Sequence, residues 1–247
     1  QAKIVLLQQV GNSTREIVKK MNTRITIITP TPPDISAFGV RSLSSYLRSK
    51  GFETRLIFLP GSISKLKKGD NFVYTYDPGV LDRIVELCRG SDIVGISFMS
   101  NYFDRAIQVT ETIKKNLDST VIWGGIHPTT SPEQSLKYAD AVCIGEGEEA
   151  LLELAERKEK KEDFYDIKGI WFKKNGAIIR NGLRESFAEL DELQFFDFSL
   201  KDHYLLDQRT NRIIPIDAGA FKNVLPRLPH PDGKLRIGYR TMTDRGC

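Results

Sequence analysis

The stretch TVIWGGIHPT, residues 120–129, joins a short apolar run to two glycines and a proline-bearing loop. The same arrangement recurs in AVCIGEGE, residues 141–148, where the apolar run is followed by Gly145 and Gly147. Each apolar run is typical of a buried strand. Each glycine cluster therefore follows the carboxyl end of a strand, the edge at which ligands bind in open α/β sheets. Glycine there permits a sharp turn and lets a bulky ligand approach the main chain closely.

Working outward from these two clusters, strands and helices alternate from Arg24 to about residue 163. The predicted strands are Ile25–Ile28, Thr54–Leu59, Asp92–Phe98, Thr120–Trp123 and Ala141–Ile144. The predicted helices are Val40–Lys50, Val80–Arg89, Tyr102–Asn116, Pro132–Tyr138 and Glu148–Lys158. Five strands alternating with five helices predict an α/β fold with a doubly wound, five-stranded parallel sheet.

The pattern changes after residue 163. Two strand-like runs flank Asn175-Gly176, the preferred pair for a tight hairpin turn. The following segment, Leu190–Phe198, is acidic and aromatic with little periodicity, and we refer to it as the linker. Leu235–Thr243 is predicted to be a further strand. We expect an extension over residues 1–23, a ligand-binding domain over 24–163 and a hairpin with a linker over 164–236.

Composition excludes several classes of function. The 247 residues carry a mild net charge of +4, and basic residues are mixed with acidic ones, so no nucleic-acid footprint is expected. No apolar run is long enough to span a membrane, and the first residues lack the pattern of a signal peptide. Three widely spaced cysteines, Cys88, Cys143 and Cys247, predict a reducing, cytoplasmic setting. The first two are expected to be small core residues.

The loop after the first strand, Pro30–Gly39, is informative by what it lacks. It has no GxGxxG fingerprint and no P-loop, so a nucleotide-sugar or dinucleotide enzyme is poorly supported. Asp34 and Asp92 do not stand where a phospho-acceptor domain would need them. Elsewhere, two interpretations remain open for the polar residues. Ser97 and Asn101 either bind a ligand or cap the following helix, and His127 is either a ligand contact or structural.

The order of these segments resembles a known family. A first strand, a helix with GVRSLSSYLR, then VGIS, GGIHPT and GEGEEAL are similar to the cobalamin-binding amino-terminal domain of cobalamin-dependent radical S-adenosylmethionine enzymes. The resemblance covers about residues 24–160 and implies a flavodoxin-like fold. It also implies a corrinoid laid over the carboxyl edge of the sheet, with its nucleotide tail running down into the domain.

The residues implied for the corrinoid are Phe38, Gly39, Ser97, Asn101, Gly124, Gly125, His127, Pro128, Thr129, Gly145, Glu146, Gly147 and Glu148. Related corrinoid domains place a cobalt-ligating histidine after the first strand, but no histidine occurs between Pro30 and Gly39. We therefore expect no cobalt ligand from this loop. The resemblance gives His127 a contact with the tail instead.

Residues 237–247 resemble the first strand of a radical S-adenosylmethionine barrel. Cys247 is then the first cysteine of a CxxxCxxC motif, which in the full-length protein would hold a [4Fe-4S] cluster that binds S-adenosylmethionine. We therefore expect a piece of a longer protein, inactive alone and partnered by the barrel. The rival hypothesis is a flavodoxin-like docking domain that has lost its cofactor.

Overall fold

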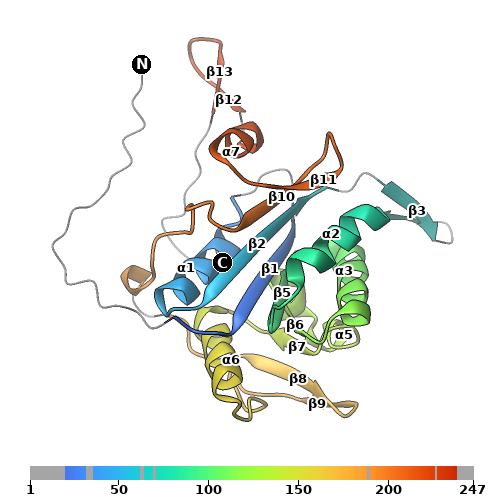
Figure 1. Cartoon of the computed structure of the whole chain (residues 1–247), viewed down its shortest axis with the longest axis vertical. Coiled ribbons are helices and arrows are strands. Elements are labelled where there is room, and N and C mark those ends of the chain that lie inside the picture. The colour runs from blue at the N-terminus through green and yellow to red at the C-terminus, as the bar shows by residue number, and fades with distance from the viewer. Residues whose placement is uncertain are drawn as a thin grey trace.

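The structure is a computed structural model that describes residues 20–31, 36–61, 64–68, 71–187, 190–225 and 227–237. The five predicted strands form the parallel centre of one sheet. They are β1 (Arg24–Thr31), β2 (Glu53–Pro60), β5 (Ile93–Ser97), β6 (Thr120–Gly124) and β7 (Ala141–Cys143). They lie in the order β2-β1-β5-β6-β7, all parallel (Figure 1). Numbered among themselves, this is the order 2-1-3-4-5 of flavodoxin-like folds. The predicted fold class is therefore confirmed.

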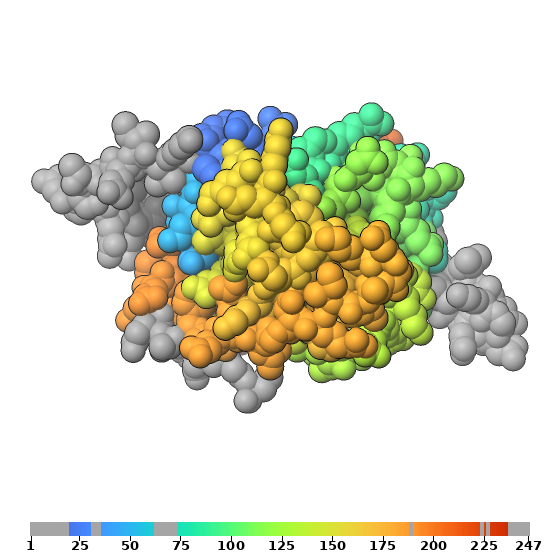
Figure 2. All heavy atoms as spheres, turned by 90° about the horizontal axis from the view of Figure 1, so that it is seen from below, coloured from blue at the N-terminus to red at the C-terminus, as the bar shows by residue number. Residues whose placement is uncertain are grey.

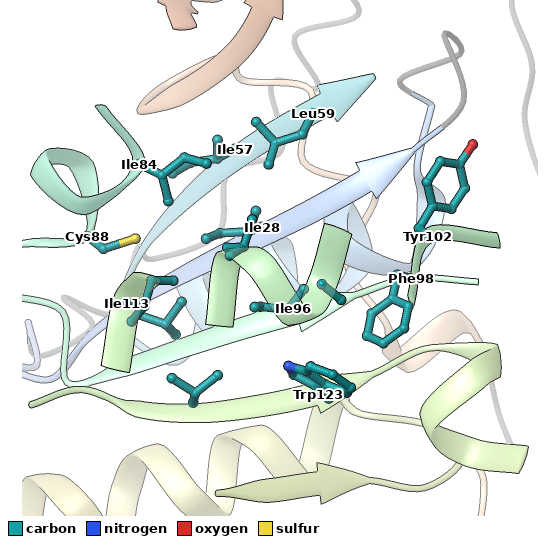
Figure 3. Close-up of a cluster of buried hydrophobic side chains, with 14 of the residues drawn as sticks. Ile28, Ile57, Leu59, Ile84, Cys88, Ile96, Phe98, Tyr102, Ile113 and Trp123 are labelled. Carbon is teal, nitrogen blue, oxygen red and sulfur yellow. The ribbon is translucent and has the colours of Figure 1, made fainter. Parts of the chain in front are cut away.

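Helices cover both faces of this sheet. On one face pack α1 (Phe38–Ser49) and α6 (Glu148–Lys160). On the other pack α2 (Pro78–Cys88), α3 (Phe103–Asn116) and the short α5 (Pro132–Ser135) (Figure 1). The short α4 (Ile126–Thr130), which follows β6, places His127 against Phe103 of α3. Because side chains alternate along a strand, Ile28 joins the α2–α3 core and Ile27 the α1–α6 core. Figure 3 shows the α2–α3 core, with Trp123 fully buried near Phe98.

The sheet continues beyond the predicted strands on both sides. The hairpin β8 (Ile170–Lys174) and β9 (Ala177–Ile179) adds to β7, antiparallel, and lies beside α6 on the face in Figure 2. Asn175 and Gly176 have φ of 51° and 81°, as the predicted tight turn requires. On the far side, β10 (His203–Asp207) pairs parallel with β2, and β11 (Arg212–Pro215) pairs antiparallel with β10. These two strands were not predicted, and the sheet has nine strands.

Smaller elements surround the sheet. The polar segment after β2 contains a separate hairpin of β3 (Ser64–Lys68) and β4 (Asn71–Thr75). Two 3-10 turns, η1 (Ser100–Tyr102) and η2 (Leu190–Glu192), and the helix α7 (Ala218–Val224) complete the connections. β12 (Arg227–Pro229) and β13 (Leu235–Ile237) form a second separate pair. Cys247 and the cluster motif predicted with it lie outside the described residues. No helix in the described ranges is long and apolar enough to cross a membrane.

Candidate functional site

A cavity of about 500 Å³ opens at the carboxyl edge of the parallel strands, between the sheet and the helices α1 and α6. Glycines that follow β1, stand at the end of β6 and follow β7 contribute to its wall, and one more glycine lies within β5. The glycines are Gly39, Gly95, Gly124, Gly125, Gly145 and Gly147. The structure thus brings together both glycine clusters of the sequence, since they follow the neighbouring strands β6 and β7. The volume is in the range of pockets that hold cofactors.

Gly95 forms the floor of the cavity from the middle of β5. A Cβ placed on it would have nothing closer than 3.9 Å, where it would meet Ile27 and Ile122. A larger side chain would therefore project into the cavity and fill it. We did not single out Gly95 from the sequence, although a glycine within the apolar strand was a signal of a close approach by a ligand or another backbone.

The backbone itself requires glycine at position 125, independently of any ligand. Its φ of 95° is in the region that favours glycine, and a Cβ would lie 2.8 Å from the carbonyl oxygen of Phe98. The loop after β6 therefore packs directly on the backbone after β5. By contrast, a Cβ on Gly124 would make only an ordinary contact, 3.9 Å from the Cβ of Cys143.

Two carboxylates flank the cavity, and each is held by a neighbouring element. Glu148, the first residue of α6, is 1% exposed and accepts a hydrogen bond of 2.6 Å from the Ser42 hydroxyl of α1. Glu146 accepts one of 3.1 Å from the backbone N–H of Phe187. Cys143 also lines the cavity, and burial raises the pKa of its thiol to about 12. The thiol is therefore neutral at physiological pH.

The segment after β9 contributes to the site, which we did not predict. Ser186 lines the cavity, and the ring of Phe187 packs edge-on against Tyr46 of α1, with 5.8 Å between ring centres. Phe38, which we predicted as a corrinoid contact, packs its ring on Phe196 at 5.0 Å. The segment after β9 therefore forms part of the wall, and the linker packs on α1.

The same linker is fixed by a buried polar cluster on α1 and β2. Asp197 is 7% exposed and accepts hydrogen bonds from Ser44 (2.6 Å), Ser199 (2.6 Å) and His203 (3.2 Å). Arg41, fully buried, donates to the Asp197 carbonyl at 2.7 Å and stacks on Phe58 and Phe198. Burial alone would raise the pKa of Asp197, but these hydrogen bonds outweigh it and hold the pKa well below its usual range.

Eight of the predicted corrinoid contacts line the cavity: Gly39, Ser97, Gly124, Gly125, Gly145, Glu146, Gly147 and Glu148. Phe38, Asn101, His127, Pro128 and Thr129 are not among its lining residues. Asn101 is exposed in η1. Thr129 accepts a hydrogen bond of 3.3 Å from the Gly145 N–H through its hydroxyl, so it joins the two glycine loops.

His127 is buried on the other side of the loop after β6. Its ring stacks against Phe98 with 5.5 Å between ring centres, and Nδ1 lies 3.1 Å from the Ser100 hydroxyl oxygen. Burial lowers the pKa of this imidazole, so the ring stays neutral at physiological pH. Within the described residues, Nε2 has no hydrogen-bond partner.

Solved structures share this fold at low sequence identity. The radical S-adenosylmethionine methyltransferase TsrM from Kitasatospora setae, with cobalamin and a [4Fe-4S] cluster bound, is 19% identical with a TM-score of 0.54, over 70% of this chain and 31% of that chain. OxsB, a cobalamin-dependent S-adenosylmethionine radical enzyme with aqua-cobalamin and S-adenosylmethionine bound, is 20% identical with a TM-score of 0.52, over 68% of this chain and 23% of that chain.

A curated relative is similar in sequence. The uncharacterized methyltransferase PH0819 of Pyrococcus horikoshii is 32% identical over 123 residues, 47% of this chain and 27% of the relative. The chain thus spans between about a quarter and a third of the proteins it matches. Residues 24–155, more than half of the 247, match the family described as the B12 binding domain. The chain therefore belongs to the B12-binding domain family.

Proposed function

We propose that this chain is the cobalamin-binding module of a radical S-adenosylmethionine enzyme. In this proposal the corrin ring lies over the carboxyl edge of the sheet, and the nucleotide tail enters the cavity between the sheet and α1 and α6. The observation that carries the proposal is the glycine-lined cavity itself, with Gly95 in its floor. A Cβ at this position would begin to fill the space that the tail needs.

The residues of the cavity fit the chemistry of such a tail. Side chains of Ile27 and Ile122 give a flat heterocycle an apolar environment, and the glycine loops let the sugar and phosphate approach the main chain. Ser97 lines the mouth and would offer a hydroxyl to the ligand. We also propose tail or ring contacts for Asn101, Thr129 and His127 at the same edge, because they belong to η1 and α4, beside the loops that line the cavity.

The bound corrinoid would supply a cobalt centre that carries a methyl group or supports radical chemistry by the barrel. This chain would hold the ring, and the loop after β1, which contains no histidine, would supply no histidine ligand to the cobalt. We propose Cys247 as the first ligand of the [4Fe-4S] cluster, because Arg240–Cys247 carries that resemblance. The substrate would then belong to the barrel.

A titration with hydroxocobalamin tests the proposal. We expect the absorbance to shift and the colour to remain with the protein in gel filtration at about one cobalamin per chain. A base-off spectrum would support the absence of a histidine ligand. If no colour is retained by this chain or by the full-length protein, the proposal fails and the docking-domain hypothesis gains support.

A pair of glycine variants adds a control for position. Gly95→Val should weaken cobalamin binding by about tenfold or more, because overfilling a packed space typically costs about 1–3 kcal/mol. Gly182→Val makes the same change where a Cβ would meet nothing within 4 Å, and Gly182 does not line the cavity. Binding to this control should match the unmodified chain.

A further inference from the structure

The cavity has an unequal distribution of apolar and polar groups. Its inner part is bounded by the side chains of Ile27, Ile122, Leu43 and Leu151 around the floor at Gly95. Ile27, Ile122 and Leu151 are 2%, 4% and 5% exposed, so a group that enters this part would leave water behind. Whatever occupies it must therefore be apolar or find polar partners inside.

Both carboxylates and the thiol of the cavity have contacts within the protein. Glu148 Oε1 accepts from Ser42, and Glu146 Oε2 accepts from the Phe187 N–H. The Cys143 thiol, a weak donor, points toward the Glu146 carbonyl at 3.9 Å. A ligand that needs several hydrogen bonds in the inner part would have to compete with these contacts.

From this distribution we infer that the cavity discriminates between corrinoids by the base of the tail, accepting dimethylbenzimidazole and disfavouring adenine. The inference rests on the proposed function. Dimethylbenzimidazole presents two methyl groups and few polar atoms to the isoleucine and leucine side chains. Adenine presents an amino group and additional ring nitrogens, which would be buried without partners, and such burial costs free energy.

The size of the effect follows from the kind of pocket. A hydrophobic pocket discriminates only moderately against a similar molecule that carries extra polar atoms, by about a hundredfold at most. We therefore expect cobalamin to bind about ten- to a hundredfold more tightly than the corrinoid with an adenine base. Ile27 and Ile122, which flank the floor, would be the residues that determine this specificity.

Three corrinoids measure the inference directly. Quenching of tryptophan fluorescence gives the Kd of cobalamin, of the adenine-containing corrinoid and of cobinamide, which lacks the nucleotide; Trp123 lies on β6, which lines the cavity, with its ring in the core on the opposite face of the sheet. We expect cobalamin to bind most tightly. Gly95→Val should weaken cobalamin binding while leaving that of cobinamide unchanged, because only the tail would reach the floor.

A matched pair of variants tests the role of Ile122. Ile122→Thr and Ile122→Val have similar shapes, so they differ mainly in one hydroxyl. In the threonine variant the preference for cobalamin over the adenine-containing corrinoid should be smaller than in the valine variant. The reason is that the threonine hydroxyl offers adenine a hydrogen-bond partner. Circular dichroism and the unfolding midpoint would show that both variants fold.

The outcomes separate the two proposals. If none of the three corrinoids binds, the proposed function fails and the inference fails with it. If all three bind equally, the chain binds corrinoids but the cavity does not hold the base, which overturns the inference alone. If cobalamin and the adenine-containing corrinoid bind equally tightly and cobinamide binds weakly, the inference is also overturned. The cavity would then hold the base without selecting between the two bases.

Discussion

Gly125 allows a sharp prediction for a single residue, because its neighbour Gly124 provides a control. Gly125→Ala should destabilise the protein by about 2 kcal/mol, since alanine would be strained at a φ of 95° and its Cβ would clash with the Phe98 carbonyl. Urea unfolding followed by circular dichroism measures the loss. Gly124→Ala, whose Cβ has room, should change the free energy of unfolding much less; equal losses would contradict this account.

At the same scale, the sequence predicted the glycines that follow an apolar run better than Gly95, which lies within one. Gly124, Gly125, Gly145 and Gly147 stand in clusters after apolar runs, so the carboxyl edge followed from the strands. Gly95 shows its role only when Ile27 and Ile122 are placed beside it, which requires the pairing of β5 with β1 and β6. Ser186 was missed because its place at the cavity depends on how the segment after β9 folds back onto α1.

At the scale of elements, the attachment of the linker to α1 predicts a dependence on acid. The pKa of Asp197 is lower in the folded chain than in the unfolded chain, so its contribution to stability is present above pH 4 and is lost progressively as the pH falls further. Asp197→Asn should cost about 2 kcal/mol at pH 7, the size of charged hydrogen bonds. Its deficit should begin to shrink below about pH 4 and should keep shrinking as the pH falls further.

Unfolding by urea at a series of pH values would measure this difference. Asp191→Asn is the matched control, since Asp191 belongs to the same linker but is exposed in η2. We expect the control to keep the stability of the unmodified chain at pH 7. A deficit of Asp197→Asn that is constant from pH 7 to pH 3 would show that the carboxylate charge does not stabilise the linker.

The linker and the strands β10 and β11 that follow it carry weak signals in the sequence. Leu190–Phe198 has little periodicity because its side chains serve different neighbours: Phe196 packs on Phe38, and Asp197 accepts from α1. β10 pairs with β2 through only three residues, His203–Leu205. Such a short strand carries a weak signal in the sequence, and its position is decided by tertiary contacts.

For the whole molecule, the sheet predicts how a shortened chain would behave. The boundary expected at residue 163 lies before β8, yet β8 pairs with β7, and β10 pairs with β2. A chain ending at residue 163 would uncover apolar surface that Phe172 and Leu205 now cover. We expect its thermal midpoint to be lower by many degrees than that of residues 1–237, measured by circular dichroism. An unchanged midpoint would show that residues 24–163 are independently stable.

The two outer strands of the sheet have a consequence for molecules at high concentration. β9 has three residues, and β11 has four and ends at Pro215, which has no N–H to donate. Short margins and proline are among the means by which proteins discourage another chain from adding to a sheet. A second copy would therefore meet few free backbone groups at either margin. At high protein concentration, neighbouring molecules should therefore not pair edge to edge into one continuous β-sheet.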